Sequence, residues 1–182
     1  MGKAIGMVEL KTVSAGITAT DLMAKTAEID IIESQTVCPG KYIALISGSI
    51  SAVNASVEAV KSKYEAELID SFLLGNPHDS IIPAIYGTTQ VTDKRSLGIL
   101  ETYSAASIIV AADSAAKTAN VTLIELRIAK GMCGKSYMLL TGEVAAVSAA
   151  IEKAKSDIKD YGMYLDSSVI ANPDSKLWDN IL

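Results

Sequence analysis

The chain has 182 residues, a net charge of −5 and no basic cluster, which argues against a nucleic-acid-binding protein. Hydrophobic residues make up 49% of the sequence, but no apolar run reaches the eighteen or so residues of a membrane-spanning helix, and no signal peptide is expected. Two cysteines favour a reducing, cytoplasmic environment with free thiols, although the count alone also allows a Cys38–Cys133 disulfide.

The first half of the chain alternates segments typical of strands and of helices. β-branched runs favour strands and Ala-rich runs favour helices. Ser49 suits the N-cap of a helix whose apolar face holds Val53, Val57, Val60 and Tyr64. We therefore expect, in chain order, a strand over 3–11, a helix over 15–28, strands over 29–37 and 41–47, a helix after Ser49, and a strand over 68–74.

The second half follows the same plan. A polar, turn-rich segment at 87–93 is the natural linker. The last helix, from Glu143, again carries one apolar face, with Val147, Ile151, Ala154 and Ile158. We expect a strand over 97–103, a helix over 105–119, strands over 121–129 and 135–141, the helix from 143, and a strand over 163–170.

The two halves are copies of one another. Between 6–32 and 98–124, a shift of 92, 10 of 27 positions are identical, including Ala24-Lys25-Thr26-Ala27 against Ala116-Lys117-Thr118-Ala119. The shift grows to 94 after the turn that follows the second strand of each half. The order β-α-β-β-α-β predicts an α+β fold of two tandem ferredoxin-like domains, 1–90 and 94–182, with antiparallel sheets. This fold alone does not assign a function.

Several motifs in both halves are similar to bacterial microcompartment shell domains. The first half carries Ala4-Ile5-Gly6-Met7-Val8-Glu9 and Asp21-Leu22-Met23-Ala24-Lys25-Thr26-Ala27, and the second carries Gly98-Ile99-Leu100-Glu101 and Lys117-Thr118-Ala119-Asn120-Val121. The doubled domain resembles the tandem-domain shell proteins. That resemblance implies a homotrimer that mimics a hexamer, tiles into a shell with other shell proteins, and is not an enzyme.

Within that family, the segment Val37-Cys38-Pro39-Gly40-Lys41 resembles the iron–sulfur type found in propanediol-utilisation shells. The resemblance implies a 4Fe–4S cluster at the trimer axis, bound through Cys38 of three chains, and electron exchange with an encapsulated redox enzyme. A single cysteine per chain cannot supply the four ligands such clusters usually take, whereas three copies of one loop bring three thiolates together. Read without the resemblance, Cys38 is better explained as a small buried thiol at a strand end, as most lone cysteines are.

The resemblance also implies which residues line the pore and which lie at tile edges. Around Cys38, the pore residues are Val37, Pro39 and Gly40. In the second half they are Gly131, Met132, Cys133 and Gly134, where Cys133 is a pore residue rather than a principal ligand. Lys25 and Lys117 are the expected edge lysines, and Asn76 and Asn172 stand where related tiles have an arginine.

Three functions remain open from the sequence. The first is a shell tile with a cluster in its pore. The second is a shell tile without a cluster, whose pore conducts small metabolites. The third is a tandem regulatory domain that binds a small ligand. His78 is expected to be a surface residue, Trp178 a packing anchor, and Glu9 and Glu101 residues of a subunit interface.

Overall fold

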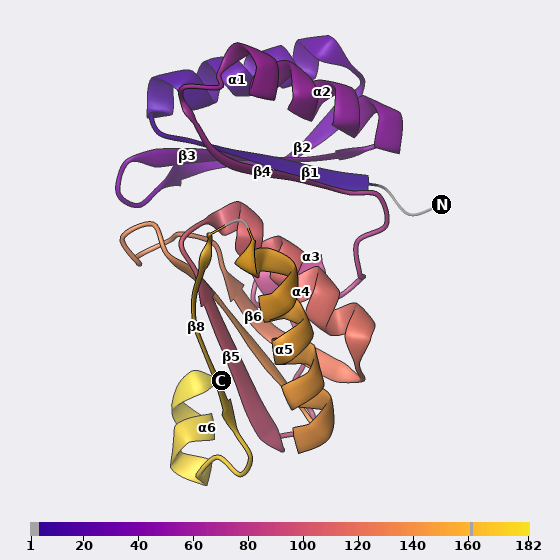
Figure 1. Ribbon diagram of the computed structural model, residues 1–182, viewed down its shortest axis with the longest axis vertical. Helices are drawn as coiled ribbons and strands as arrows, with labels where there is room; N and C mark the ends of the chain where they lie inside the picture. Colours follow the sequence, from indigo (N-terminus) through magenta and orange to yellow (C-terminus); the bar gives the residue numbers. More distant parts are fainter. Residues whose placement is uncertain (1–3, 161) are drawn as a thin grey trace. The chain divides into compact units, whose positions relative to one another are not determined.

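The computed structural model describes residues 4–160 and 162–182. Each half of the chain forms a four-stranded antiparallel sheet, built in the order β-α-β-β-α-β (Figure 1). The predicted α+β class and the two ferredoxin-like halves are confirmed. The predicted start of the first strand at Lys3 lies outside the described residues.

The first sheet has the strand order β2-β3-β1-β4. Strands and helices alternate along the chain in the order predicted from the sequence, and β2 and β4 end at Val37 and Leu74 as predicted. Ser49 caps the second helix, because its side chain accepts a hydrogen bond of 3.2 Å from the N–H of Ala52. The elements are β1 (Ala4–Leu10), α1 (Val13–Thr26), β2 (Ile29–Val37), β3 (Lys41–Gly48), α2 (Ile50–Lys63) and β4 (Leu68–Leu74).

The second sheet repeats that order as β6-β7-β5-β8. Glu143 precedes α5 without a side-chain capping bond and instead pairs with Arg95, so it is a weaker cap than Ser49. The elements are β5 (Ser96–Thr102), α4 (Ala105–Thr118), β6 (Val121–Arg127), β7 (Ser136–Gly142), α5 (Val144–Lys159) and β8 (Tyr164–Ile170).

In the first half, α1 and α2 cover one face of the sheet (Figure 1). Alternate strand residues point into this layer, as the period of two in a strand requires. Gly6 lets α2 approach closely, because a Cβ there would lie 2.6 Å from a methyl of Val53. The buried cluster consists of Ala4, Val8, Leu10, Ala19, Met23, Ala44, Ile46, Val53, Val57 and Val60.

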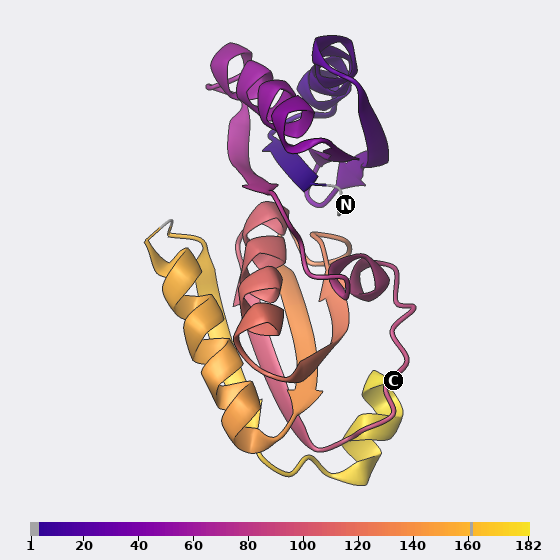
Figure 2. The ribbon, with the colours of Figure 1, turned by 90° about the vertical axis from the view of Figure 1, so that its right-hand side faces the viewer.

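Two short helices were not foreseen from the sequence. These are α3 (Ile81–Ile85) and α6 (Ser175–Ile181), the latter near the C-terminus (Figure 2). The side chain of Asp174 accepts a 2.9 Å bond from the N–H of Lys176, a capping signal that was present in the sequence. Trp178 is confirmed as a packing anchor, since it is buried with Leu97 and Ile124.

The chain divides into two compact units that do not coincide with the two sequence halves. The first unit holds the residues up to Pro77 and also Ser104–Ser107 and Ile128–Lys135, and the second holds the remainder. Strand β6 therefore ends at Arg127 rather than at 129, because the chain leaves the second sheet there. The domain limits of 90 and 94 stay a prediction.

Candidate functional sites

The Cys38 turn joins β2 to β3 in the first unit. Cys38 is half-buried and is a free thiol, as is Cys133. The peptide bond before Pro39 is cis, and the N–H of Gly40 donates a 2.9 Å bond to the carbonyl of Val37. Gly40 has φ of +101°, which is why glycine suits this position. The tight turn leaves the thiol near the surface rather than in the core.

The segment Ile128–Lys135 packs beside this turn, inside the same unit. The N–H of Cys38 donates a 3.0 Å bond to the carbonyl of Ala129. A surface hollow of about 420 Å³ lies between the two segments, lined by Thr36–Gly40, Lys130 and Gly131. The structure thus brings together the two loops that were predicted to line one pore. Cys133 is exposed and does not line this hollow.

A buried ion pair anchors the two loops. The side chain of Glu9 is fully buried and that of Lys41 is 14% exposed, and their charged groups are in contact. Lys41 Nζ also donates a 3.1 Å bond to the carbonyl of Gly134, and the N–H of Ala105 donates a 2.8 Å bond to Glu9 Oε2. The expectation that Glu9 faces a subunit interface is wrong, because its carboxylate is satisfied within the first unit.

Burial dominates the electrostatics of Glu9. Desolvation raises the pKa of its carboxyl above the usual 4.5, while the hydrogen bond and charge of Lys41 and the N–H of Ala105 act in the opposite direction. A second pair lies beside the hollow, where Lys130 Nζ is 2.8 Å from Glu33 Oε1. Lys41 follows the Cys38 turn and Lys130 lines the hollow beside it, and each lysine is paired with a carboxylate.

The donor set around Cys38 is small. Among the described residues, no three His, Cys, Asp or Glu side chains are grouped closely enough to hold a metal ion. What the chain offers is one half-buried thiol at the edge of a surface hollow. A thiolate is the ligand that iron–sulfur clusters take, so Cys38 fits such a cluster as one of its usual four ligands.

The predicted edge lysines have the same local pairing in both halves. Lys25 lies 2.6 Å from Asp21, and Lys117 lies 2.6 Å from Asp113, each across one helical turn. Lys25 is the more exposed of the two. Asp113 is largely buried and also accepts a 2.7 Å bond from the N–H of His78, itself an exposed residue as expected.

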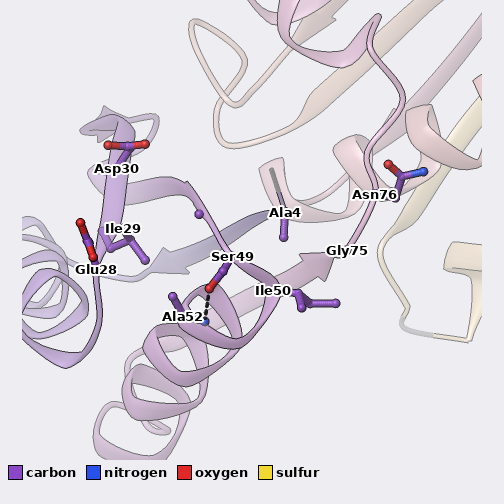
Figure 3. Close-up of a pocket in the computed structure, with 10 residues that line it drawn as sticks. Ala4, Glu28, Ile29, Asp30, Ser49, Ile50, Ala52, Gly75 and Asn76 are labelled. Carbon is purple, nitrogen blue, oxygen red and sulfur yellow. Dashed lines mark hydrogen bonds between the residues drawn. The ribbon is translucent and has the colours of Figure 1, made fainter. Parts of the chain in front are cut away.

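Asn76, one of the two predicted edge asparagines, borders an open cavity of about 890 Å³ in the first unit (Figure 3). Figure 3 shows the carboxylates of Glu28 and Asp30 on one side of this cavity, with Ile50 and Asn76 on the other. Ile50, the first residue of α2, is 58% exposed at the edge of this cavity. Asn172, the counterpart of Asn76, is exposed after β8.

Sequence reasoning missed the roles of Glu9 and Lys41. A lone acid within the apolar strand Ala4–Leu10 was the available signal, since an unpaired buried carboxylate is costly. Its partners could not be located, because Ala105 lies 96 residues further along the chain. In the part of the chain that the structure describes, no helix is long and apolar enough to cross a membrane.

Comparison with known proteins accounts for the doubled fold. A model of the BMC (bacterial microcompartment) domain matches residues 4–77 and 96–173. The shell protein PduT of Citrobacter freundii is 38% identical over 98% of this chain and 97% of its own. A microcompartment protein from Desulfitobacterium hafniense DCB is 43% identical, with a TM-score of 0.86 over 98% of this chain and 99% of its own.

A third protein shares the fold alone. The fused permuted hexameric shell protein MSM0275 from the RMM microcompartment is 20% identical, with a TM-score of 0.65 over 88% of this chain and 85% of its own. The two matched domains, the near-full-length relatives and the paired ferredoxin-like sheets agree with one another. The chain belongs to the bacterial microcompartment shell-protein family and is a tandem-domain member of it.

Proposed function

We propose that this protein is a structural tile of a bacterial microcompartment shell. Three chains form a ring of six similar domains, a pseudohexamer, with the Cys38 turn at its centre. The close match over both domains supports a tile over a regulatory ligand-binding protein. Other shell proteins of the compartment are then its neighbours, and the compartment shell is its location.

We further propose that the three Cys38 thiolates hold a 4Fe–4S cluster in the pore. The observation that carries this proposal is the placement of Cys38, half-buried in a tight turn beside a surface hollow, while the described residues of one chain form no group of three metal ligands. A bound cluster would supply one-electron transfer across the shell, with an encapsulated redox enzyme as its partner. Pro39 and Gly40 orient the thiol, and Lys41 ties the turn to its neighbouring loop.

Cluster binding is tested by comparing the wild-type protein with Cys38→Ser, both purified without oxygen and reconstituted with iron and sulfide. The matched control is Cys133→Ser, because Cys133 is exposed but lies outside the hollow. We expect a cluster signal in electron paramagnetic resonance for the reduced wild-type and control proteins, and none for Cys38→Ser. A wild-type trimer that contains no iron after reconstitution would refute the cluster proposal and would favour a pore that conducts small metabolites.

Tiling is tested separately by electron microscopy of sheets formed by the purified protein. We expect Lys25→Glu combined with Lys117→Glu to abolish sheets, since both lysines are exposed at corresponding places in the two halves. Lys61→Glu is the control, because this lysine is an exposed member of an ion pair on α2. Sheets that persist in the double variant would show that the contacts between tiles lie elsewhere.

A further inference from the structure

Two neighbouring carboxylates in the first unit hold the residues that begin α4. Glu9 and Asp70 face each other across β1 and β4. Glu9 Oε2 accepts the 2.8 Å bond from the N–H of Ala105, and Asp70 Oδ2 accepts a 2.6 Å bond from the hydroxyl of Ser107 and a further bond from that of Ser104. Carboxylates at a helix N-terminus satisfy its free N–H groups and its positive dipole end.

The second half carries the same acceptors. Glu101 on β5 lies opposite Asp166 on β8, in the same strand register in which Glu9 lies opposite Asp70. Asp166 Oδ1 accepts a 2.8 Å bond from the N–H of Ser167, just as Asp70 Oδ1 accepts one of 2.8 Å from the N–H of Ser71. Lys135 occupies the place of Lys41 at the start of the third strand.

These acceptors lack the partners that their first-half counterparts have. Within residues 4–160 and 162–182, no side chain or backbone group bonds to Asp166 Oδ2 or to the carboxylate of Glu101, and the ammonium of Lys135 has no acceptor. Glu101 is half-buried, and Asp166 and Lys135 are exposed. The second half therefore carries the same acceptor residues as the first, but in the described part of the chain no helix start binds to them as the start of α4 binds to Glu9 and Asp70.

The matching helix start is present in the first half of the sequence. Thr12 stands in the place of Ser104, and its hydroxyl accepts a 3.3 Å bond from the N–H of Ala15, as the hydroxyl of Ser104 accepts one of 3.0 Å from the N–H of Ser107. Thr12 is exposed at the beginning of α1. Gly40 stands in the place of Gly134, whose carbonyl Lys41 binds.

We propose that Glu101, Asp166 and Lys135 of one chain bind a second copy of this chain. Glu101 and Asp166 receive the beginning of its α1 at Thr12 and Val13, and Lys135 binds its Gly40 carbonyl. The contact between chains thus repeats the contact made inside the first unit. This inference rests on the proposed trimer and names the residues that build it.

The arrangement also explains how such an assembly closes. Each chain carries the helix start in one half and the acceptors in the other, so the contact is head-to-tail and generates a ring or a filament. A ring of six like domains then needs three chains, and no Glu101 or Asp166 remains without a partner.

Crosslinking tests this geometry. In a background of Cys38→Ser and Cys133→Ser, Thr12→Cys is combined with Asp166→Cys and treated with a short bismaleimide. We expect covalently linked chains on a denaturing gel, ending at the trimer. The matched control replaces Asp160 instead of Asp166, because Asp160 is also an exposed acid in the second half, and we expect it to give no ladder.

Self-association is measured in parallel by sedimentation. Glu101→Ala with Asp166→Ala should weaken the assembly at least tenfold, whereas Glu152→Ala with Asp160→Ala, two exposed acids of the second half, should not. A wild-type trimer that gives no crosslink and is not weakened by the first pair would overturn this inference while leaving the tile intact. A wild-type monomer would overturn the proposed trimer itself.

Discussion

The buried pair of Glu9 and Lys41 gives the sharpest test of how the first unit is held together. In Lys41→Met, the fully buried Glu9 carboxylate keeps the N–H of Ala105 but loses the counter-charge of Lys41. Removing one partner of a buried ion pair costs about 3–5 kcal/mol. For a chain of this length, that loss corresponds to a fall of roughly 10 °C in the melting temperature.

The assay is urea unfolding at fixed protein concentration, with Glu9→Gln combined with Lys41→Met as the second variant. The double variant removes both charges and keeps an amide oxygen for Ala105, so we expect it to recover more than half of the loss. Lys61→Met, in an exposed pair with Glu58, should change stability by less than about 1 kcal/mol. An equally small loss in Lys41→Met, or a double variant no more stable than the single one, would refute the reasoning.

Three further predictions concern single positions. Burial raises the pKa of the Glu9 carboxyl, so protonated Glu9 stabilises the fold fully below about pH 4.5, and this contribution is lost as the pH rises through the raised pKa. In urea unfolding, the wild-type protein should therefore lose stability towards neutral pH relative to Glu9→Gln. Gly16→Ala should lower the melting temperature followed by circular dichroism, since its Cβ would lie 2.3 Å from the side chain of Tyr42, and an unchanged value would contradict this packing. Trp178→Ala should cost about 3–5 kcal/mol in urea unfolding, against a small effect of Leu177→Ala, and equal effects would argue against α6 as a packing element.

The repeat explains why both halves keep a glycine in the first strand. Gly98, the counterpart of Gly6, would place a Cβ 2.7 Å from Leu140 and 2.8 Å from Val147. The glycine thus allows a helix to lie close to the sheet in each half. The identity of these positions across the repeat reflects packing, whereas the differences between Cys38-Pro39-Gly40 and Gly131-Met132-Cys133-Gly134 lie in the loops predicted to face one pore.

Most of the fold could be predicted from local patterns. The apolar faces of the two long helices after Ser49 and Glu143 are buried as expected, with Val53, Val57 and Val60 in one half and Val147, Ile151, Ala154 and Ile158 in the other. Helix and strand periodicities are properties of neighbouring residues, so the sequence displays them directly. The short helices α3 and α6 were missed because a few residues carry too little periodicity to be recognised.

The sequence alone determined that this protein is a doubled β-α-β-β-α-β chain, and it placed Cys38 in a tight turn between two strands. Only the tertiary structure decided that Ile128–Lys135 and the start of α4 belong with the first sheet, and that Glu9 is buried there with Lys41. The physical reason is distance along the chain. Contacts such as the bond from Ala105 to Glu9 join residues 96 apart, and no local pattern records which buried charge meets which partner.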